Sequence, residues 1–212
     1  MEFRLLYSGS LLGASKNDTR AHVKHSIRRE FHPQLRRLWA TKNKLVEAAQ
    51  MYGAVEWQND TQHSDQEAPS NSFELGIDAM SKRWDRFGYK FLPLVTEELC
   101  SRCSLEILFL RPEEPGLLIR SGDLDGRIKT IFDALRLPSN LKETGEVGPA
   151  EDETPFYCLL EDDKLISEIR VTTDELLLRP KERELKANDV FLLINIKIQR
   201  IKEGASMNWI FG

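Results

Sequence analysis

The sequence lacks an excess of basic residues, a long apolar run and a secretion signal. Lysine and arginine total 30 against 34 aspartates and glutamates, for a net charge of −4, which argues against a generally polycationic nucleic-acid binder. No apolar run approaches the roughly 20 residues of a membrane span, and residues 1–13 lack the basic and apolar regions of a signal peptide. We therefore expect a cytoplasmic protein with no membrane partner.

Cysteine is also scarce. The three cysteines are Cys100, Cys103 and Cys158, and an odd, low count argues against a disulfide framework and fits a reducing cytoplasm. Cys100 and Cys103 form a single CxxC, whereas a zinc site needs about four ligands. We interpret the pair as two small residues before a strand, with a metal or redox site as the alternative.

Hydrophobic residues make up 41% of the chain and charged residues 30%, so a sizeable core is possible. Pro33 suits the first turn of a helix, and Gly88 suits the end of one. Residues 58–72 are almost entirely polar, which predicts a loop or a disordered linker. Periodicity predicts strands at 3–8, 104–110, 165–172 and 189–201, and helices from Pro33 onward, at 73–87 and at 122–135.

The expected order is strand, helix, helix, strand, helix, strand, strand. This order predicts an α/β (α+β) fold in which helices cover one side of a mixed β-sheet.

A basic stretch runs from residue 20 to residue 44, where eight lysines and arginines accompany one acid, Glu30. It is either a solvated helix face or a patch that faces DNA phosphates, and the sequence leaves both interpretations open. Three histidines in the stretch are expected at the surface or in the DNA patch: His22, His25 and His32. The candidate DNA-binding residues are Arg20, Lys24, Arg28, Arg29, Arg36 and Arg37.

Two acidic clusters lie where elements are expected to begin. Asp123 and Asp125 stand at the start of the 122–135 helix, with Lys129 one turn later, and Asp162 and Asp163 precede a strand. Adjacent carboxylates repel one another unless a cation neutralises them, and Mg²⁺ binds a few carboxylates together with water and phosphate. Such an ion assists phosphodiester displacement, and a nearby lysine can stabilise the developing charge. The alternative is that these acids cap helices or are only solvated.

The sequence around these two acidic clusters is similar to that of a known protein family. The segments Asp-Leu-Asp-Gly-Arg-Ile-Lys-Thr-Ile-Phe-Asp-Ala-Leu (123–135) and Leu-Glu-Asp-Asp-Lys-Leu-Ile-Ser-Glu-Ile-Arg-Val (160–171) resemble the RusA family of Holliday-junction resolvases. That family has an acidic DxDN segment, a lysine on the same helix, FDAL, a DD pair and a strand that ends in RV. The expected strand at 189–201 fits the family's closing strand.

The resemblance implies a usually dimeric, Mg²⁺-dependent (or Mn²⁺-dependent) endonuclease that resolves four-way DNA junctions by phosphodiester hydrolysis in recombination and repair. By position, Asp123 and Asp125 match the two metal-binding acids of the first motif, and Lys129 matches the catalytic lysine. Asp163 matches the third essential acid, with Asp162 as its neighbour and a further candidate ligand. Branched DNA and a second copy of the chain are the implied partners.

The sequence departs from the family in three ways. Gly126 stands where the family commonly has Asn, residues 14–98 form a largely helical insertion into a single RusA-like domain of residues 1–212, and the acidic loop 139–155 is long. These departures motivate an alternative, a non-catalytic nucleic-acid-binding or partner-docking protein on a resolvase-like scaffold. A third possibility keeps the enzyme but changes its substrate to flaps, RNA hybrids or another phosphodiester.

Overall fold

The computed structural model describes residues 1–13, 21–61, 70–112, 124–177 and 188–201. Its helices are α1 (Ala21–Thr41), α2 (Asn43–Thr61), α3 (Ser72–Ser81) and α5 (Leu124–Leu135). Its strands are β1 (Glu2–Ser10), β2 (Asp85–Arg86), β3 (Tyr89–Val95), β4 (Ser101–Arg111), β5 (Phe156–Leu160), β6 (Ile166–Glu175) and β7 (Asp189–Arg200). Short 3₁₀ helices occur at η1 (Lys82–Trp84), η2 (Leu141–Thr144), η3 (Glu151–Glu153) and η4 (Asp163–Leu165).

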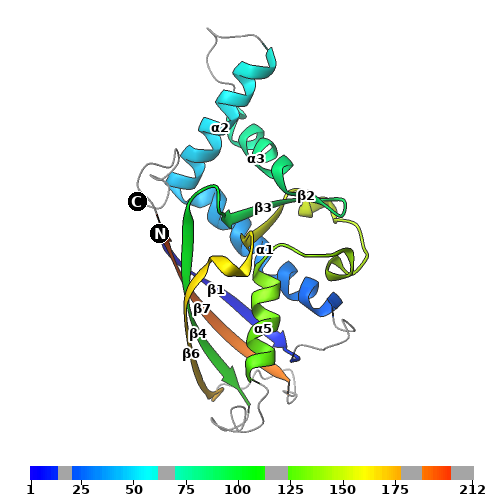
Figure 1. Cartoon of the computed structure of the whole chain (residues 1–212), viewed down its shortest axis with the longest axis vertical. Coiled ribbons are helices and arrows are strands. Elements are labelled where there is room, and N and C mark those ends of the chain that lie inside the picture. The colour runs from blue at the N-terminus through cyan, green and yellow to red at the C-terminus, as the bar shows by residue number, and fades with distance from the viewer. Residues whose placement is uncertain (14–20, 62–69, 113–123, 178–187, 202–212) are drawn as a thin grey trace.

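Two sheets form the β-structure. The larger has the order β1-β7-β4-β6, with β4 and β6 parallel and the other neighbours antiparallel, and the smaller has the order β2-β3-β5. Helices α1 and α5 lie on one side of the larger sheet (Figure 1). The predicted α+β class with a mixed sheet is therefore confirmed. Within the described residues, no helix is long and apolar enough to cross a membrane.

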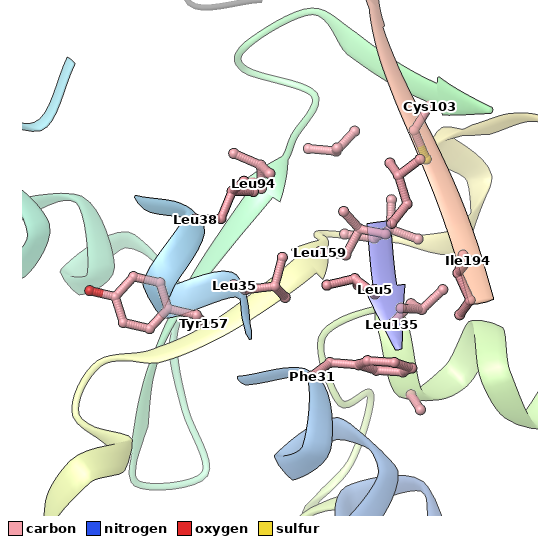
Figure 2. Packing of buried hydrophobic residues seen from close by; sticks show 14 of the residues in the cluster. Leu5, Phe31, Leu35, Leu38, Leu94, Cys103, Leu135, Tyr157, Leu159 and Ile194 are labelled. Carbon is pink, nitrogen blue, oxygen red and sulfur yellow. The ribbon is translucent and has the colours of Figure 1, made fainter. Parts of the chain in front are cut away.

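The main core lies between the larger sheet, the smaller sheet and the two helices. Phe31 and Leu35 of α1 point toward Leu5 of β1 and Leu135 of α5 (Figure 2), and all four side chains are buried. Apolar burial of this kind contributes roughly 1.5–3 kcal/mol for each large side chain. This packing fixes α1 and α5 against each other and against the larger sheet.

The prediction that a helix begins at Pro33 was wrong, because α1 begins at Ala21 and contains Pro33. A proline inside a helix removes one backbone hydrogen bond and costs about 3 kcal/mol. The buried stripe of Ile27, Phe31 and Leu35 continues across the proline, whose own ring is exposed. Burial of that stripe outweighs the local cost.

The predicted helix at 73–87 is also shorter than expected. Helix α3 ends at Ser81, and Phe87 and Gly88 form the turn between β2 and β3 with φ values of 55° and 80°. Two successive positive φ values are typical of a tight hairpin turn, which explains the glycine at this position. Phe87 is therefore exposed and does not belong to the core. In the polar segment 58–72, α2 continues to Thr61, and residues 62–69 lie outside the described residues.

Helices α2 and α3 cross where two glycines meet the opposite backbone. A Cβ at Gly76 would lie 1.7 Å from the carbonyl oxygen of Ala49, and a Cβ at Gly53 would lie 1.8 Å from that of Ser72. The absence of side chains at both positions lets the helices approach this closely.

We expect Gly76→Ala to lower the free energy of unfolding by about 2 kcal/mol, because the clash with backbone outweighs the roughly 1 kcal/mol by which alanine favours a helix. Urea unfolding measures the change. Gly148→Ala is the matched control, since a Cβ there would meet nothing within 4 Å. Equal stability of the two variants would show that the helices can separate without cost.

Candidate functional site

The start of α5 presents two of the predicted catalytic residues on one exposed face. Asp125 and Lys129 are both exposed, and residues four apart are neighbours along a helix. Between them, Arg127 is buried and donates hydrogen bonds from its guanidinium to the Leu11 carbonyl at 2.8 Å and to Asn188 Oδ1 at 2.9 Å. The helix start is therefore anchored to the segment after β1 and to the residue before β7.

Thr130 adds a second anchor to this end of the helix. Its hydroxyl lies 3.1 Å from the Leu12 carbonyl and 3.0 Å from the Gly126 carbonyl, and it can donate to either. Gly126, the position where the RusA family commonly has Asn, is a residue of α5 in the structure. The glycine thus does not prevent the helix from beginning at Leu124. Asp123, the residue before it, lies outside the described residues.

Asp162 and Asp163 lie at the other end of α5. The Leu137 N–H donates to the Leu160 carbonyl at 3.0 Å, which joins the end of α5 to the end of β5. Asp162 caps η4 by accepting from the Lys164 N–H at 3.0 Å. Asp163 follows directly, is exposed, and lies close enough to Arg136 for its charge to act on that guanidinium. Both acids therefore lie near the C-terminal end of α5, on the segment that follows β5.

The structure does not bring Asp163 and Asp125 together. Asp125 and Arg136 are eleven positions apart along the chain, which at a helical rise of 1.5 Å per residue is about 16 Å. Two carboxylates that share one ion with metal–oxygen bonds of about 2 Å must lie within about 5 Å of each other. Of the predicted ligands that the structure describes, Asp125 and Asp163 therefore do not share one ion, because β5 ends beside the far end of the helix and Asp163 follows it there.

No group of three or more His, Cys, Asp or Glu side chains that could hold a metal occurs among the described residues. Mg²⁺, however, commonly uses only one or two protein carboxylates and completes its shell with water and substrate phosphates. Asp125 with its sequence neighbour Asp123 matches that donor set. Asp163 and Asp162 do not belong to it.

Much of the basic stretch is turned inward, toward the acidic segment 139–155. Arg28 is 1% exposed, and its guanidinium donates to the carbonyls of Asp133 at 2.7 Å, Arg136 at 3.1 Å and Glu143 at 3.1 Å. A guanidinium enclosed in this way cannot reach a phosphate. The prediction that Arg28 binds DNA was therefore wrong.

Lys24 forms ion pairs with acids in the same region. Its ammonium lies 2.8 Å from Asp133 and 3.1 Å from Glu143, and Arg136 also pairs with both acids. Burial alone would raise the pKa of Asp133, but the hydrogen bond from Lys24 and the charge of Arg136 outweigh it and hold that pKa below its usual value. These groups, with Arg28, form what we term the α1 ion network.

Arg29 and His32 hold the rest of segment 139–155. Arg29 makes a two-point ion pair with Glu153, at 2.5 Å and 3.0 Å. His32 accepts from the Tyr157 N–H at 3.0 Å and donates to the Asp152 carbonyl at 3.1 Å. Segment 139–155 is thus fastened to α1 through η2 and η3.

The bases of the stretch that stay exposed are Arg36 and Arg37 on α1, followed by Lys42 and Lys44. These four are the described residues of the stretch that remain available for phosphate contacts. Arg20 lies outside the described residues.

His25 is buried against Arg28 and Tyr89, which contradicts its predicted surface position, and His32 is buried as well. Burial, reinforced by the charges of Arg28 and Arg29, lowers the pKa of His25 to about 4. The folded protein therefore holds this imidazole neutral where the unfolded chain would bind a proton. Its contribution to stability is complete above the unfolded value of about 6.5 and is lost as the pH falls toward 4.

We expect the free energy of unfolding to fall by about 2 kcal/mol from His25 alone between about pH 7 and pH 5. Urea unfolding across that range measures the fall, which should be smaller by this amount in His25→Gln. His32, whose pKa burial also lowers, accounts for part of the remaining slope. Parallel pH curves for wild type and His25→Gln would contradict the assignment.

Cys103, the second cysteine of the CxxC pair, lies within β4. Cys103 and Cys158 are buried, and burial raises the pKa of each thiol to about 12. The thiolate is the nucleophilic form of cysteine, so these two groups are inert near neutral pH.

Sequence reasoning missed the α1 ion network. The sequence does contain two oppositely charged segments, the stretch 20–44 and the segment 139–155. A local sequence pattern cannot show, however, that residues more than 100 positions apart form ion pairs. Comparisons of the chain with protein-family models, with curated proteins and with solved structures give no match.

Proposed function

We propose that the protein is a Mg²⁺-dependent endonuclease of the RusA type, which resolves four-way DNA junctions by hydrolysing phosphodiester bonds. One observation supports this proposal above the others. Asp125 and Lys129, the two described residues of the resemblance's first motif, lie exposed and one turn apart on a helix start that Arg127 and Thr130 anchor. An exposed acid and base on a rigid element are suited to work on a large, external substrate.

The residues at the start of α5 would each have a separate role in the reaction. Asp125, with Asp123, would hold Mg²⁺ or Mn²⁺, which supplies Lewis acidity at the phosphate and a more acidic water molecule. Lys129 would stabilise negative charge on the phosphate oxygens as it develops. Arg127 takes no part in bond breaking and positions the helix start. Asp163, at the far end of α5, is left out of this reaction centre.

Branched DNA is the proposed partner, and its backbone would lie along the exposed bases Arg36, Arg37, Lys42 and Lys44. We propose that the active form is a homodimer, since paired cuts across a junction require two reaction centres. A cytoplasmic location is consistent with the three free cysteines, Cys100, Cys103 and Cys158.

Cleavage of a synthetic four-way junction tests the proposal. Purified protein should release nicked duplexes in Mg²⁺ and none after chelation, and linear duplex of the same sequence should be cut far more slowly. Substitution of flap and RNA-hybrid substrates for the junction identifies the branched structure that the enzyme prefers. Tight junction binding with no metal-dependent cutting on any of these substrates would contradict an enzymatic function.

The second candidate is a non-catalytic nucleic-acid-binding protein on the same scaffold. The separation of Asp163 from Asp125 favours it, because it leaves the start of α5 with fewer acids than the resemblance implies. This candidate predicts that Asp125→Asn retains full junction affinity and that Mg²⁺ produces no cuts. The nuclease proposal predicts cuts by the wild type that disappear in the same variant.

A further inference from the structure

The larger sheet ends in two edge strands, β1 and β6 (Figure 1). An edge strand presents backbone N–H and C=O groups with which a further strand can pair. The edge of β1 is occupied at Leu6, whose N–H donates to Gln34 Oε1 at 2.9 Å and whose carbonyl accepts from Gln34 Nε2 at 2.7 Å. These are the two kinds of hydrogen bond that a neighbouring strand would make, so the side chain of Gln34 takes the place of one.

The edge of β6 carries a row of backbone groups that point away from the sheet. The Leu176 N–H, directly after β6, donates to the Arg111 carbonyl of β4 at 2.6 Å, and backbone groups alternate between the two sides of a strand. The groups of Ile169, Val171 and Thr173, an odd number of positions from Leu176, therefore point away from β4. No hydrogen bond to them occurs in the part of the chain that the structure describes. We term these three residues the open edge of β6.

The side chains of the open edge continue rows of the main core. Leu105 and Ile107 of β4 lie opposite Ile169 and Val171 of β6, and both leucine and isoleucine of β4 are buried. Val171 packs against the core, whereas Ile169 is 48% exposed. An apolar side chain on a further strand would lie about 5 Å from Ile169 and cover it. The inner face of β6 is therefore suited to a strand with apolar residues at alternate positions.

The other face of β6 carries an acid at each end of the open edge. Glu168 and Asp174 are exposed, and Arg170 and Thr172 lie between them. The Arg170 guanidinium already lies 3.9 Å from Glu106 of β4, so the two acids leave net negative charge beside any strand that is added. Opposite charges directly across a sheet stabilise the pairing. The edge therefore favours a strand that carries basic residues opposite Glu168 and Asp174.

These charges disfavour a second copy of the same edge. Antiparallel pairing of two β6 strands about Val171 would place Glu168 of each copy opposite Asp174 of the other, so acids would face acids twice. Like charges directly opposite one another in a sheet are destabilising. The same two acids repel the anionic phosphates of nucleic acid.

We propose that the open edge of β6 binds an extended segment of another protein as a fifth strand of the larger sheet, and that this segment is basic at both ends and apolar at alternate positions between them. Its backbone would pair with the open edge, its apolar side chains would cover Ile169 and Val171, and its bases would lie beside Glu168 and Asp174. Main-chain hydrogen bonds give such a complex its affinity, and alternate side chains give it specificity. None of these groups belongs to the proposed reaction centre, so peptide binding and DNA cleavage can be tested separately.

A fluorescent peptide of the sequence Lys-Val-Thr-Val-Thr-Val-Lys tests the proposal by its anisotropy with the full chain. We expect it to bind at least about tenfold more tightly than Glu-Val-Thr-Val-Thr-Val-Glu. Glu168→Lys combined with Asp174→Lys should reverse the preference between the two peptides, because the charges beside the edge change sign. Glu47→Lys is the matched control, since Glu47 is an exposed acid of α2, and it should leave both affinities unchanged. Circular dichroism verifies that the variants are folded.

Amide hydrogen exchange followed by NMR locates the bound peptide. The amides of Ile169, Val171 and Thr173 should exchange slowly only when the lysine peptide is bound, whereas those of Arg170 and Thr172, which point toward β4, should change little. Slow exchange at the open edge without peptide would overturn the proposal, because the chain would then cover its own edge. Slowing that grows with protein concentration would overturn it in favour of a second copy. Equal affinity for the two peptides, or no binding of the lysine peptide, would also overturn it.

Discussion

Replacing Arg28 with methionine should lower the free energy of unfolding by about 3–5 kcal/mol, since removal of one member of a buried charged network leaves its partners unpaired. Arg28 donates to three carbonyls at the junction of α1, α5 and η2. Methionine preserves the length and much of the volume of the side chain but supplies no donor. The carbonyls of Asp133, Arg136 and Glu143 would each lose a partner inside the protein.

Equilibrium unfolding in urea, followed by circular dichroism, measures this effect. Arg37→Met is the matched control, because Arg37 lies on the same helix but is exposed, and a surface substitution is expected to change stability by no more than about 0.5 kcal/mol. A loss below about 1 kcal/mol for Arg28→Met would show that the guanidinium is not part of a structural network. Arg28 would then again be a candidate for binding DNA.

Asp125→Asn should reduce kcat/KM for junction cleavage by at least about 100-fold. Even groups that only orient a metal ligand cost about 10–100-fold when they are replaced, and a ligand itself should cost more. Asparagine keeps the shape of the side chain and removes its charge, so folding and DNA binding should persist. Gel-shift affinity for the junction in the absence of metal verifies that binding is intact.

Asp163→Asn is the informative comparison, since Asp163 is the third acid of the resemblance but lies at the far end of α5. On the arrangement in the structure, its cleavage rate should stay within about threefold of the wild type, the range expected of an exposed substitution away from the reaction centre. Equal and large losses in both variants would mean that the three acids act as one site. The placement of the reaction centre would then be wrong, although the nuclease function would stand.

The sequence predicted the elements in which the pattern of burial repeats regularly. β4, β7 and β1 each bury alternate residues, and α5 buries one helical stripe. The strands β3 and β5 escaped prediction because every residue of β5, and all but Lys90 in β3, is buried. A short, continuous apolar run shows no alternation of apolar and polar residues, so periodicity alone does not identify it as a strand. The start of α1 was not predicted, because burial of its apolar residues in the core stabilises the helix on both sides of Pro33.

The same distinction holds for the candidate site: relations between residues close in the sequence could be predicted, and relations between distant residues could not. The relation between Asp125 and Lys129 is local, and helical spacing alone places them on one face. The position of Asp163 depends on where β5 ends against α5, and the inward turn of Arg28 and Lys24 depends on acids more than 100 positions away. No periodicity encodes such distant contacts, so the basic stretch resembled a DNA-binding surface.

The location of bound metal tests the central claim, that the start of α5 is the reaction centre, most directly. Substoichiometric Mn²⁺ added to isotopically labelled protein broadens the NMR amide signals of nuclei near the ion. The account predicts selective broadening at Asp125 and the residues around it, reduced in Asp125→Asn, while the signals of η4 stay sharp. Broadening centred on Asp163, or none at the start of α5, would contradict it.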